Sequence, residues 1–261
     1  MTTILPFLPE RPAKPRQSGI AMVMDKGMSV REAEDFVSVG SDLTDFVKLG
    51  FGTSIITPNI DKKISIYKNA GIIPYLGGTL FEAFIIRNMF DQYVELLDKY
   101  EITMVEVSDG SYDFDHNKKL EYISRLAEKR TVVSEVGSKK NDVVYSPNQW
   151  VDMMKSELEA GSFKVIAEAR ESGTIGIFNE DGSINNTIID AISHHVSLDN
   201  VIWEAPLKSQ QAWFIKHFGA NVNLGNIAPN ELIALETLRL RLRGDTFFQF
   251  LPQYLYIHNV K

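Results

Sequence analysis

Short apolar segments alternate with longer amphipathic segments along the chain from residue 20 onward. The short segments are rich in Val and Ile and are bounded by Gly, Ser or Asp, a pattern that predicts buried strands. These segments are 20–24, 45–49, 72–76, 104–107, 132–136, 164–169, 201–205 and 221–224. The amphipathic segments predict helices at 30–39, 61–70, 81–100, 117–129, 148–160, 184–196, 209–218 and 231–242. A strand followed by a helix is therefore the repeating unit of the chain.

Local signals mark the ends of several predicted helices. Ser29 followed three residues later by Glu32 predicts a capping box at the start of the first helix. Pro147 occupies a position that the first turn of a helix tolerates. Three glycines each end a helix just before a strand, and these are Gly71, Gly161 and Gly219.

Eight strand–helix units in about 240 residues predict the α/β class and a single (β/α)8 TIM barrel. The nearest alternative is a doubly wound open sheet, which carries a glycine-rich turn after its first strand. The first turn here, Met24-Asp25-Lys26-Gly27-Met28, lacks the G-x-G-x-x-G pattern, and the chain contains no P-loop motif. We therefore expect an extended N-terminal arm at 1–18, the barrel at 19–250 and a C-terminal tail at 251–261.

The expected arm contains a basic, proline-rich stretch, Arg11-Pro12-Ala13-Lys14-Pro15-Arg16. Proline fixes φ and stiffens an extended chain. Two interpretations remain open for this stretch. It is either a plain extended arm, or an arm that covers one end of the fold or contacts an anionic ligand.

Composition and the ends of the chain exclude several classes of protein. The net charge is −7, from 27 basic and 34 acidic residues, which argues against a nucleic-acid partner because such binding needs a basic surface. The absence of cysteine excludes disulfides, thiolate nucleophiles and iron–sulfur clusters. The first residues do not resemble a signal peptide, and no apolar run approaches the ~20 residues of a membrane span. We expect a cytoplasmic protein without membrane contact.

Charged and amide residues stand at the ends of the predicted strands, where TIM barrels hold their active sites. These residues are Asp25, Lys26, Lys48, Glu106, Glu135, Glu168, Glu204, Asn223 and Asn226. An ionised side chain is costly to bury inside an apolar strand unless it is paired or binds a metal. A single strand glutamate is as often a structural ion-pair partner as a functional residue. The repetition on strand after strand predicts an active site.

The residue types at these positions indicate the chemistry. Several convergent carboxylates suit a hard cation such as Mg²⁺. Lys48, Lys139 and Arg170 suit an anionic substrate, because a guanidinium can grip phosphate or carboxylate with two parallel hydrogen bonds. The stretch 170–176, Arg-Glu-Ser-Gly-Thr-Ile-Gly, is typical of a phosphate-binding loop, since glycine lets backbone N–H groups approach an anion. Its alternative interpretation is an ordinary surface turn.

Dispersed short motifs connect these residues to a known family. The motifs include Asp25-Lys26-Gly27, Gly77-Gly-Thr-Leu-Phe-Glu82, Val105-Glu-Val-Ser-Asp-Gly-Ser111, Ser134-Glu-Val-Gly-Ser-Lys139, Glu168-Ala-Arg-Glu-Ser-Gly173, Trp203-Glu-Ala-Pro206 and Asn221-Val-Asn-Leu-Gly-Asn-Ile227. In this order, over about residues 11 to 248, the chain resembles the phosphosulfolactate synthase family, whose members add sulfite to phosphoenolpyruvate. The family also includes plant heat-stress-associated relatives.

The resemblance implies a (β/α)8 barrel, Mg²⁺ dependence, and phosphoenolpyruvate and sulfite as substrates. On this basis we assign catalysis to Lys139, Lys48 and Glu106, metal binding to Glu135, Glu168 and Glu204, and substrate binding to Asp25, Lys26, Arg170, Ser172, Gly173, Asn223 and Asn226. Which of Glu106, Glu135, Glu168 and Glu204 bind the metal and which only support the ligands stays open. Lys140 is the alternative to Lys139 as general acid, because Ser138 is inserted before the lysine of the motif. We also expect a homo-oligomer.

Two alternative functions stay open on the sequence alone. One is a different Mg²⁺-dependent barrel enzyme that acts on a phosphorylated enol- or keto-acid and ignores sulfite. The other is a non-catalytic, stress-related paralogue on the same scaffold. The charged strand ends argue against the second, since a scaffold does not need them.

Overall fold

The computed structural model describes residues 5–138, 144–249 and 251–255. Its strands are β1 (Ala21–Asp25), β2 (Phe46–Leu49), β3 (Ile73–Leu76), β4 (Met104–Val107), β5 (Thr131–Val136), β6 (Ser162–Ala167), β7 (Val201–Glu204) and β8 (Leu224–Ile227). Its helices are α1 (Val30–Gly40), α2 (Ile60–Asn69), α3 (Gly78–Ile85), α4 (Phe90–Lys99), α5 (His116–Ala127), α6 (Pro147–Glu159), α7 (Asn186–His195), α8 (Lys208–Phe218) and α9 (Leu232–Arg239). No helix among the described residues combines the length and apolar character needed to cross a membrane.

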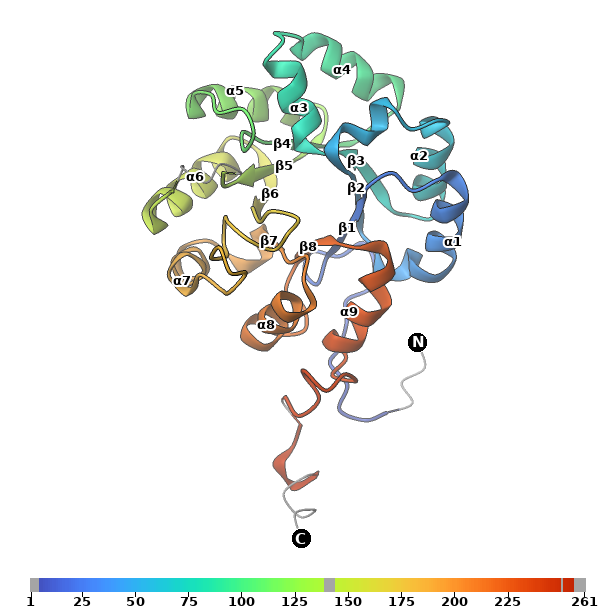
Figure 1. Cartoon of the computed structure of the whole chain (residues 1–261), viewed down its shortest axis with the longest axis vertical. Helices are drawn as coiled ribbons and strands as arrows, with labels where there is room; N and C mark the ends of the chain where they lie inside the picture. The colour runs from blue at the N-terminus through green and yellow to red at the C-terminus, as the bar shows by residue number, and fades with distance from the viewer. Residues whose placement is uncertain (1–4, 139–143, 250, 256–261) are drawn as a thin grey trace.

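The strands form one parallel sheet in the order β3-β2-β1-β8-β7-β6-β5-β4, curled into a barrel with the helices around it (Figure 1). This confirms the predicted (β/α)8 architecture. The capping box of Ser29 and Glu32 and the position of Pro147 in the first turn of α6 are confirmed as well. After α9 the chain extends away from the barrel (Figure 1).

The barrel has a seam between β3 and β4, because no ladder of hydrogen bonds joins these two among the described strands. The N–H groups of Ile73 and Gly77 donate to the carbonyls of Asp45, directly before β2, and of Leu49 in β2, so the backbone nitrogen of Pro74 faces the other side, toward β4. Proline has no N–H to donate and is confined to edge strands for that reason. Pro74 therefore prevents a regular ladder at this seam.

Side chains inside the barrel separate into an apolar lower layer and a charged upper layer. The lower layer is a closed apolar cluster of Ile20, Met22, Phe46, Tyr75, Met104, Val133, Ile166 and Ile202. Because successive residues of a strand alternate between its two faces, the residue two positions further on points into the barrel again, nearer the carboxyl end. That upper layer holds the ionisable residues described below.

Predicted boundaries shift by up to three residues, and two differences stand out. The predicted helix 81–100 is two helices, α3 and α4, separated by a turn that contains Asn88, whose φ is 55°. Asparagine tolerates this left-handed conformation better than most residues, so it can end a helix. The last strand begins at Leu224, three residues later than the predicted start at Asn221.

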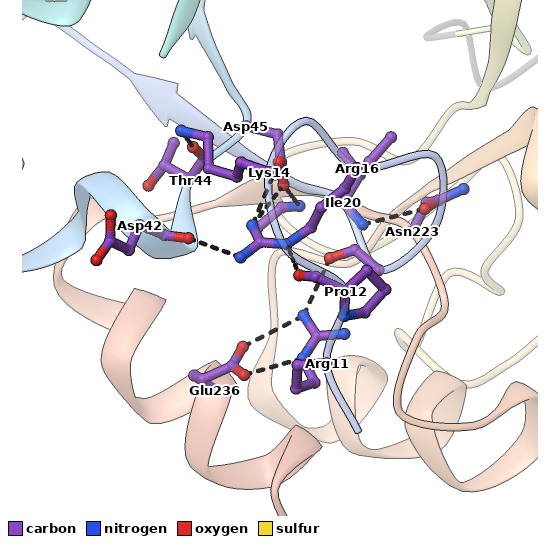
Figure 2. A network of polar contacts seen from close by, with 12 residues as sticks. Arg11, Pro12, Lys14, Arg16, Ile20, Asp42, Thr44, Asp45, Asn223 and Glu236 are labelled. Carbon is purple, nitrogen blue, oxygen red and sulfur yellow. Dashed lines mark hydrogen bonds and ion pairs between the residues drawn. The ribbon is translucent and has the colours of Figure 1, made fainter. Parts of the chain in front are cut away.

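The N-terminal arm lies against the amino-terminal end of the barrel (Figure 2). Arg16 Nη1 lies 3.2 Å from both carboxylate oxygens of Asp45, which also accepts the N–H of Ala21. Arg11 Nε donates to Glu236 on α9 over 2.9 Å, and Lys14 Nζ donates to the carbonyl of Thr44. Among the two interpretations of the basic stretch, these contacts support an arm that covers one end of the fold.

Candidate active site

The ionisable residues at the carboxyl end of the barrel are placed there by strand alternation. Each follows an interior apolar residue by two positions, which gives the pairs Phe46 and Lys48, Met104 and Glu106, Val133 and Glu135, Ile166 and Glu168, and Ile202 and Glu204. All five ionisable side chains are buried. The sequence therefore brings one cation and four carboxyl groups into a single layer above the apolar cluster.

Lys48 is the centre of this layer. Its Nζ lies 3.0 Å from Glu106 Oε1, 3.1 Å from Glu135 Oε2 and 3.3 Å from Glu204 Oε1. Burial lowers the pKa of Lys48, but the three carboxyl groups around it raise the pKa further, to well above its ordinary value. Lys48 is therefore a permanent cation in the absence of substrate, and it cannot act as a base at neutral pH.

The pKa of Glu106 is raised as well, which for a carboxyl group favours the neutral form. Burial raises its pKa above the ordinary value, the ammonium of Lys48 lowers it, and the neighbouring Glu135 raises it again. Glu106 also accepts a hydrogen bond of 2.6 Å from the backbone N–H of Gly78 at the start of α3. From β4, Glu106 thus contacts Lys48 on β2 and the start of α3, both on the other side of the seam.

Glu135, Glu168 and Glu204 form a group that can hold a cation. One carboxylate oxygen from each lies within 4.8 Å of the others, and all three residues are buried. They line a pocket of about 40 Å³, together with Met24, Lys48, Gly77, Thr79 and Asn226. A cavity needs about 10–15 Å³ to hold one water, so the pocket has room for an ion with bound water. An all-oxygen donor set of this kind fits Mg²⁺.

A second group of side chains holds the seam together above β3 and β4. Glu82 of α3 is buried and accepts hydrogen bonds from Ser108 Oγ over 2.5 Å and from the N–H groups of Ser111 and Tyr112. Glu106 reaches across in the other direction, to Gly78. A Cβ atom on Gly78 would lie 2.2 Å from Ser108 Oγ, so only glycine fits there. These contacts explain why the motif Gly77-Gly-Thr-Leu-Phe-Glu82 needs a glycine at position 78 and a carboxylate at position 82.

Two residues assigned to substrate binding lie elsewhere. Asp25 faces the helices, not the pocket, because Met22 and Met24 occupy the inward positions of β1. Its carboxylate is paired with Lys63 Nζ at 2.8 Å and accepts a hydrogen bond from Tyr67. Asn223 lies at the opposite end of the barrel, where its Oδ1 accepts the N–H of Ile20 (Figure 2). Its Nδ2 donates to the carbonyls of Asp199 and Val201. Both assignments are corrected to structural roles.

The predicted phosphate loop lies at the rim of the pocket. Gly173 is buried, and a Cβ there would lie 2.6 Å from Leu207, while Gln210 Nε2 donates to its carbonyl. This glycine packs against α8, and the assignments of Ser172 and Gly173 to substrate binding stay predictions. Ser172 is exposed and bonds Thr174, and the half-buried Arg170 side chain contacts none of the described residues through a hydrogen bond or ion pair.

Lys26 is exposed at the same rim and forms an ion pair with Glu171, which lines the pocket. Its assignment to substrate binding stays a prediction. Lys139 and its alternative Lys140 lie outside the described residues, so their assignment to proton transfer also stays a prediction.

Sequence reasoning did not assign a role to Glu82 or Thr79. Both belong to the motif at 77–82, and the signal for Glu82 was a carboxylate on the apolar face of a helix, buried beside Phe81. Its partners, however, lie on the β4–α5 connection, and only the packing of α3 across the seam brings them next to Glu82.

A nearly closed barrel of parallel strands, with a lysine and four carboxyl groups at the carboxyl ends of the strands, places the protein in the class of TIM-barrel enzymes. The family model described as (2R)-phospho-3-sulfolactate synthase (ComA) matches residues 9–245. The chain belongs to this family, whose enzymes form a carbon–sulfur bond.

Curated relatives agree with the family model. The chain is 39% identical over 244 residues to the phosphosulfolactate synthase of Bacillus subtilis, covering 92% of this chain and 97% of that one. It is 41% identical over 237 residues to the phosphosulfolactate synthase of Methanocaldococcus jannaschii, covering 88% and 94%.

Solved structures support the fold. A 3-hexulose-6-phosphate synthase from Salmonella typhimurium superposes with a TM-score of 0.55 at 14% identity, over 86% of this chain and 100% of that one. At this identity the likeness shows the barrel and nothing about the substrate.

Proposed function

We propose that this protein catalyses the Mg²⁺-dependent addition of sulfite to the methylene carbon of phosphoenolpyruvate, giving (2R)-2-O-phospho-3-sulfolactate. The observation that carries the proposal is the group Glu135, Glu168 and Glu204, whose oxygens converge within 4.8 Å beside Lys48 in a chain of this family. Both substrates are anions, so they need cations to lie close together.

The reaction balances as one addition. The sulfur lone pair of sulfite forms the C–S bond at the methylene carbon, and the electrons of the C=C bond move toward the substrate carboxylate. One proton then adds to the carbon that bears the phosphate. No group leaves, and no oxidant or reductant is required.

Glu135, Glu168 and Glu204 would hold the divalent cation. When bound there, the cation supplies a positive charge for the carboxylate on which negative charge develops. Lys48 would hold Glu135 and Glu204 in place and keep part of their charge neutralised. Glu106 would position Lys48 by its bond to Gly78, so its proposed contribution is indirect.

Lys139 is proposed as the general acid that protonates the substrate carbon. Arg170 and Lys26, at the rim, are proposed to attract the phosphate and sulfite groups, since Arg170 has no partner within the described chain and Lys26 is exposed. A homo-oligomeric state also remains part of the proposal.

A direct assay tests the function. The purified protein is incubated with Mg²⁺, phosphoenolpyruvate and sulfite, and phosphosulfolactate is measured by mass spectrometry. Product that disappears without sulfite or with a chelator is the expected result, and Lys139→Ala should remove most turnover. Absence of product from the complete mixture would contradict the proposal.

A further inference from the structure

The pairing of β8 with β1 contains an irregularity next to the pocket. Ala21 pairs with Leu224 and Val23 pairs with Ile227, so β8 contains one more residue than β1 over the same span. The extra residue is a β-bulge at Gly225 and Asn226. Such bulges redirect a side chain and are common beside active sites.

The bulge changes both the backbone and the direction of Asn226. Its φ is 56°, in the left-handed region, and its N–H faces the sulfur of Met22 at 3.5 Å instead of a backbone carbonyl. The side chain consequently lines the pocket that contains Glu135, Glu168 and Glu204.

The amide of Asn226 has an oxygen without a donor. The residue is 7% exposed, and its Oδ1 is buried with no hydrogen-bond partner in the described structure. Leaving a buried acceptor unsatisfied is destabilising, because the oxygen loses its hydrogen bonds to water and gains none in the protein. A bound group that attracts an oxygen lone pair would remove this cost.

The backbone alone does not account for asparagine at this position. Glycine adopts a positive φ more readily than asparagine and buries no polar atom. A purely structural bulge with this positive φ would therefore favour glycine at position 226. The unsatisfied oxygen points to a ligand of the pocket.

We infer that Asn226 Oδ1 is a further oxygen ligand of the divalent cation, aimed by the β8 bulge at the site formed by Glu135, Glu168 and Glu204. The inference rests on the proposed metal site. Amide oxygens and carboxylates are both suitable ligands for such hard cations. The bulge then serves to bring a neutral ligand to a group of three anions.

The test measures Mn²⁺, used in place of Mg²⁺, by electron paramagnetic resonance titration of the full chain without substrate. Asn226→Gly keeps the backbone conformation but removes the amide, so the melting temperature without metal should stay the same or rise. Its Kd for Mn²⁺ should increase at least about tenfold. Asn226→Asp, which keeps an oxygen and tolerates positive φ, should bind Mn²⁺ at least as tightly as the wild type.

Asn88→Gly is the matched control, because Asn88 has φ 55° but lies in the turn between α3 and α4. Its Mn²⁺ affinity should equal that of the wild type. An unchanged Kd for Mn²⁺ in Asn226→Gly would overturn the inference. If the KM for phosphoenolpyruvate rose in that case, Asn226 would contact the substrate and not the metal. Failure of the wild type to bind Mn²⁺ would overturn it as well. Metal binding that depends on Asn226, without formation of phosphosulfolactate, would support the inference and contradict the proposed reaction alone.

Discussion

At the scale of single residues, Lys48 determines whether the carboxyl groups of the site can stay together. Glu106, Glu135 and Glu204 all lie within 3.3 Å of its ammonium group. Without the ammonium group, carboxylates gathered around the same point would repel one another strongly in a buried environment. The lysine is thus as important for the fold of the pocket as for the binding of an anionic substrate.

We predict that Lys48→Met lowers the free energy of unfolding by about 3–5 kcal/mol, because it leaves buried carboxylates without their cation. Turnover should fall at least about 100-fold, as expected for loss of a preorganised charge. Chemical denaturation and the product assay check the two effects. Lys62→Met is the control, since that side chain is 61% exposed, and equal losses in both variants would contradict the prediction.

A second buried pair connects to the site through the backbone of β5. Lys119 Nζ lies 2.7 Å from Glu157 and 2.8 Å from Asp109, and it donates to the carbonyl of Glu135. Burial raises the pKa of Glu157 to about 7, although the ammonium of Lys119 lowers it. The folded protein therefore holds a proton that the unfolded chain releases near pH 4.5.

This difference makes stability depend on pH. The contribution of Glu157 decreases as pH rises from about 4.5 to about 7, because only the unfolded chain ionises freely there, and it is constant above that range. The decrease is about 3 kcal/mol. Glu157→Gln should flatten this part of the profile, measured by denaturation between pH 5 and 8. Glu159→Gln, an exposed change on the same helix, should leave it as in the wild type; identical profiles for all three proteins would exclude the effect.

The residue scale also shows how far the sequence could predict the site. Alternation along each strand is enough to place Glu106, Glu135, Glu168 and Glu204 in one layer. The same rule, applied to β1 from Met22 and Met24, would have placed Asp25 outside the barrel. Asn226 could not be placed in this way, because a bulge breaks the alternation and depends on the neighbouring strand.

At the scale of elements, the seam between β3 and β4 is held by side chains in place of a ladder. Glu82 binds the start of the β4–α5 connection, and Glu106 binds the start of α3. The two carboxyl groups face opposite directions across the seam. The position of Glu106 against Lys48 therefore depends on how firmly α3 contacts β4.

We predict that Glu82→Gln loosens this connection. The amide NH₂ would face backbone donors that now meet a carboxylate, which costs about 1–3 kcal/mol of stability. Hydrogen exchange at the amides of Ser111 and Tyr112 should become faster, and kcat should fall about tenfold with a smaller change in KM. Glu95→Gln on the exposed face of α4 is the control. Unchanged exchange at both amides would show that Glu82 does not hold the loop.

The predicted and observed boundaries of strands and helices show which of them the local sequence determines. β4 has the predicted bounds, since Met104–Val107 is an apolar run with one inward glutamate. β8 was predicted too early, because Gly225 and Asn226 look like a turn in sequence. Only the pairing with β1 and β7 makes them part of a strand. The break between α3 and α4 likewise depends on a single residue with positive φ, Asn88.

At the scale of the whole molecule, the two ends of the barrel have separate tasks. The carboxyl end contains the pocket, whereas the amino end is covered by the arm and by Arg239, which donates to three backbone carbonyls. In TIM barrels the amino end serves stability. Length and periodicity predicted the barrel, but not which end the arm covers, because most of its contacts come from residues 26 to 225 positions away.

We predict that Arg16→Ala lowers stability without affecting turnover. Arg16 and Asp45 are almost fully buried, so loss of the guanidinium should cost about 3 kcal/mol. The kcat should stay within about twofold of the wild type, since the pocket is at the other end. Arg87→Ala, an exposed change, controls for loss of charge. A large fall in kcat at full folding would contradict this separation of the two ends.

The seam has a consequence for the behaviour of many copies in one solution. An unpaired strand is a template to which another chain can add, and such edges are frequent starting points of aggregation. Here β3 turns a proline toward its unpaired side, and α3 packs against β4. Pro74 thus has a second effect besides opening the barrel: it removes one hydrogen-bond donor that an incoming strand would need at the β3 edge of the described sheet.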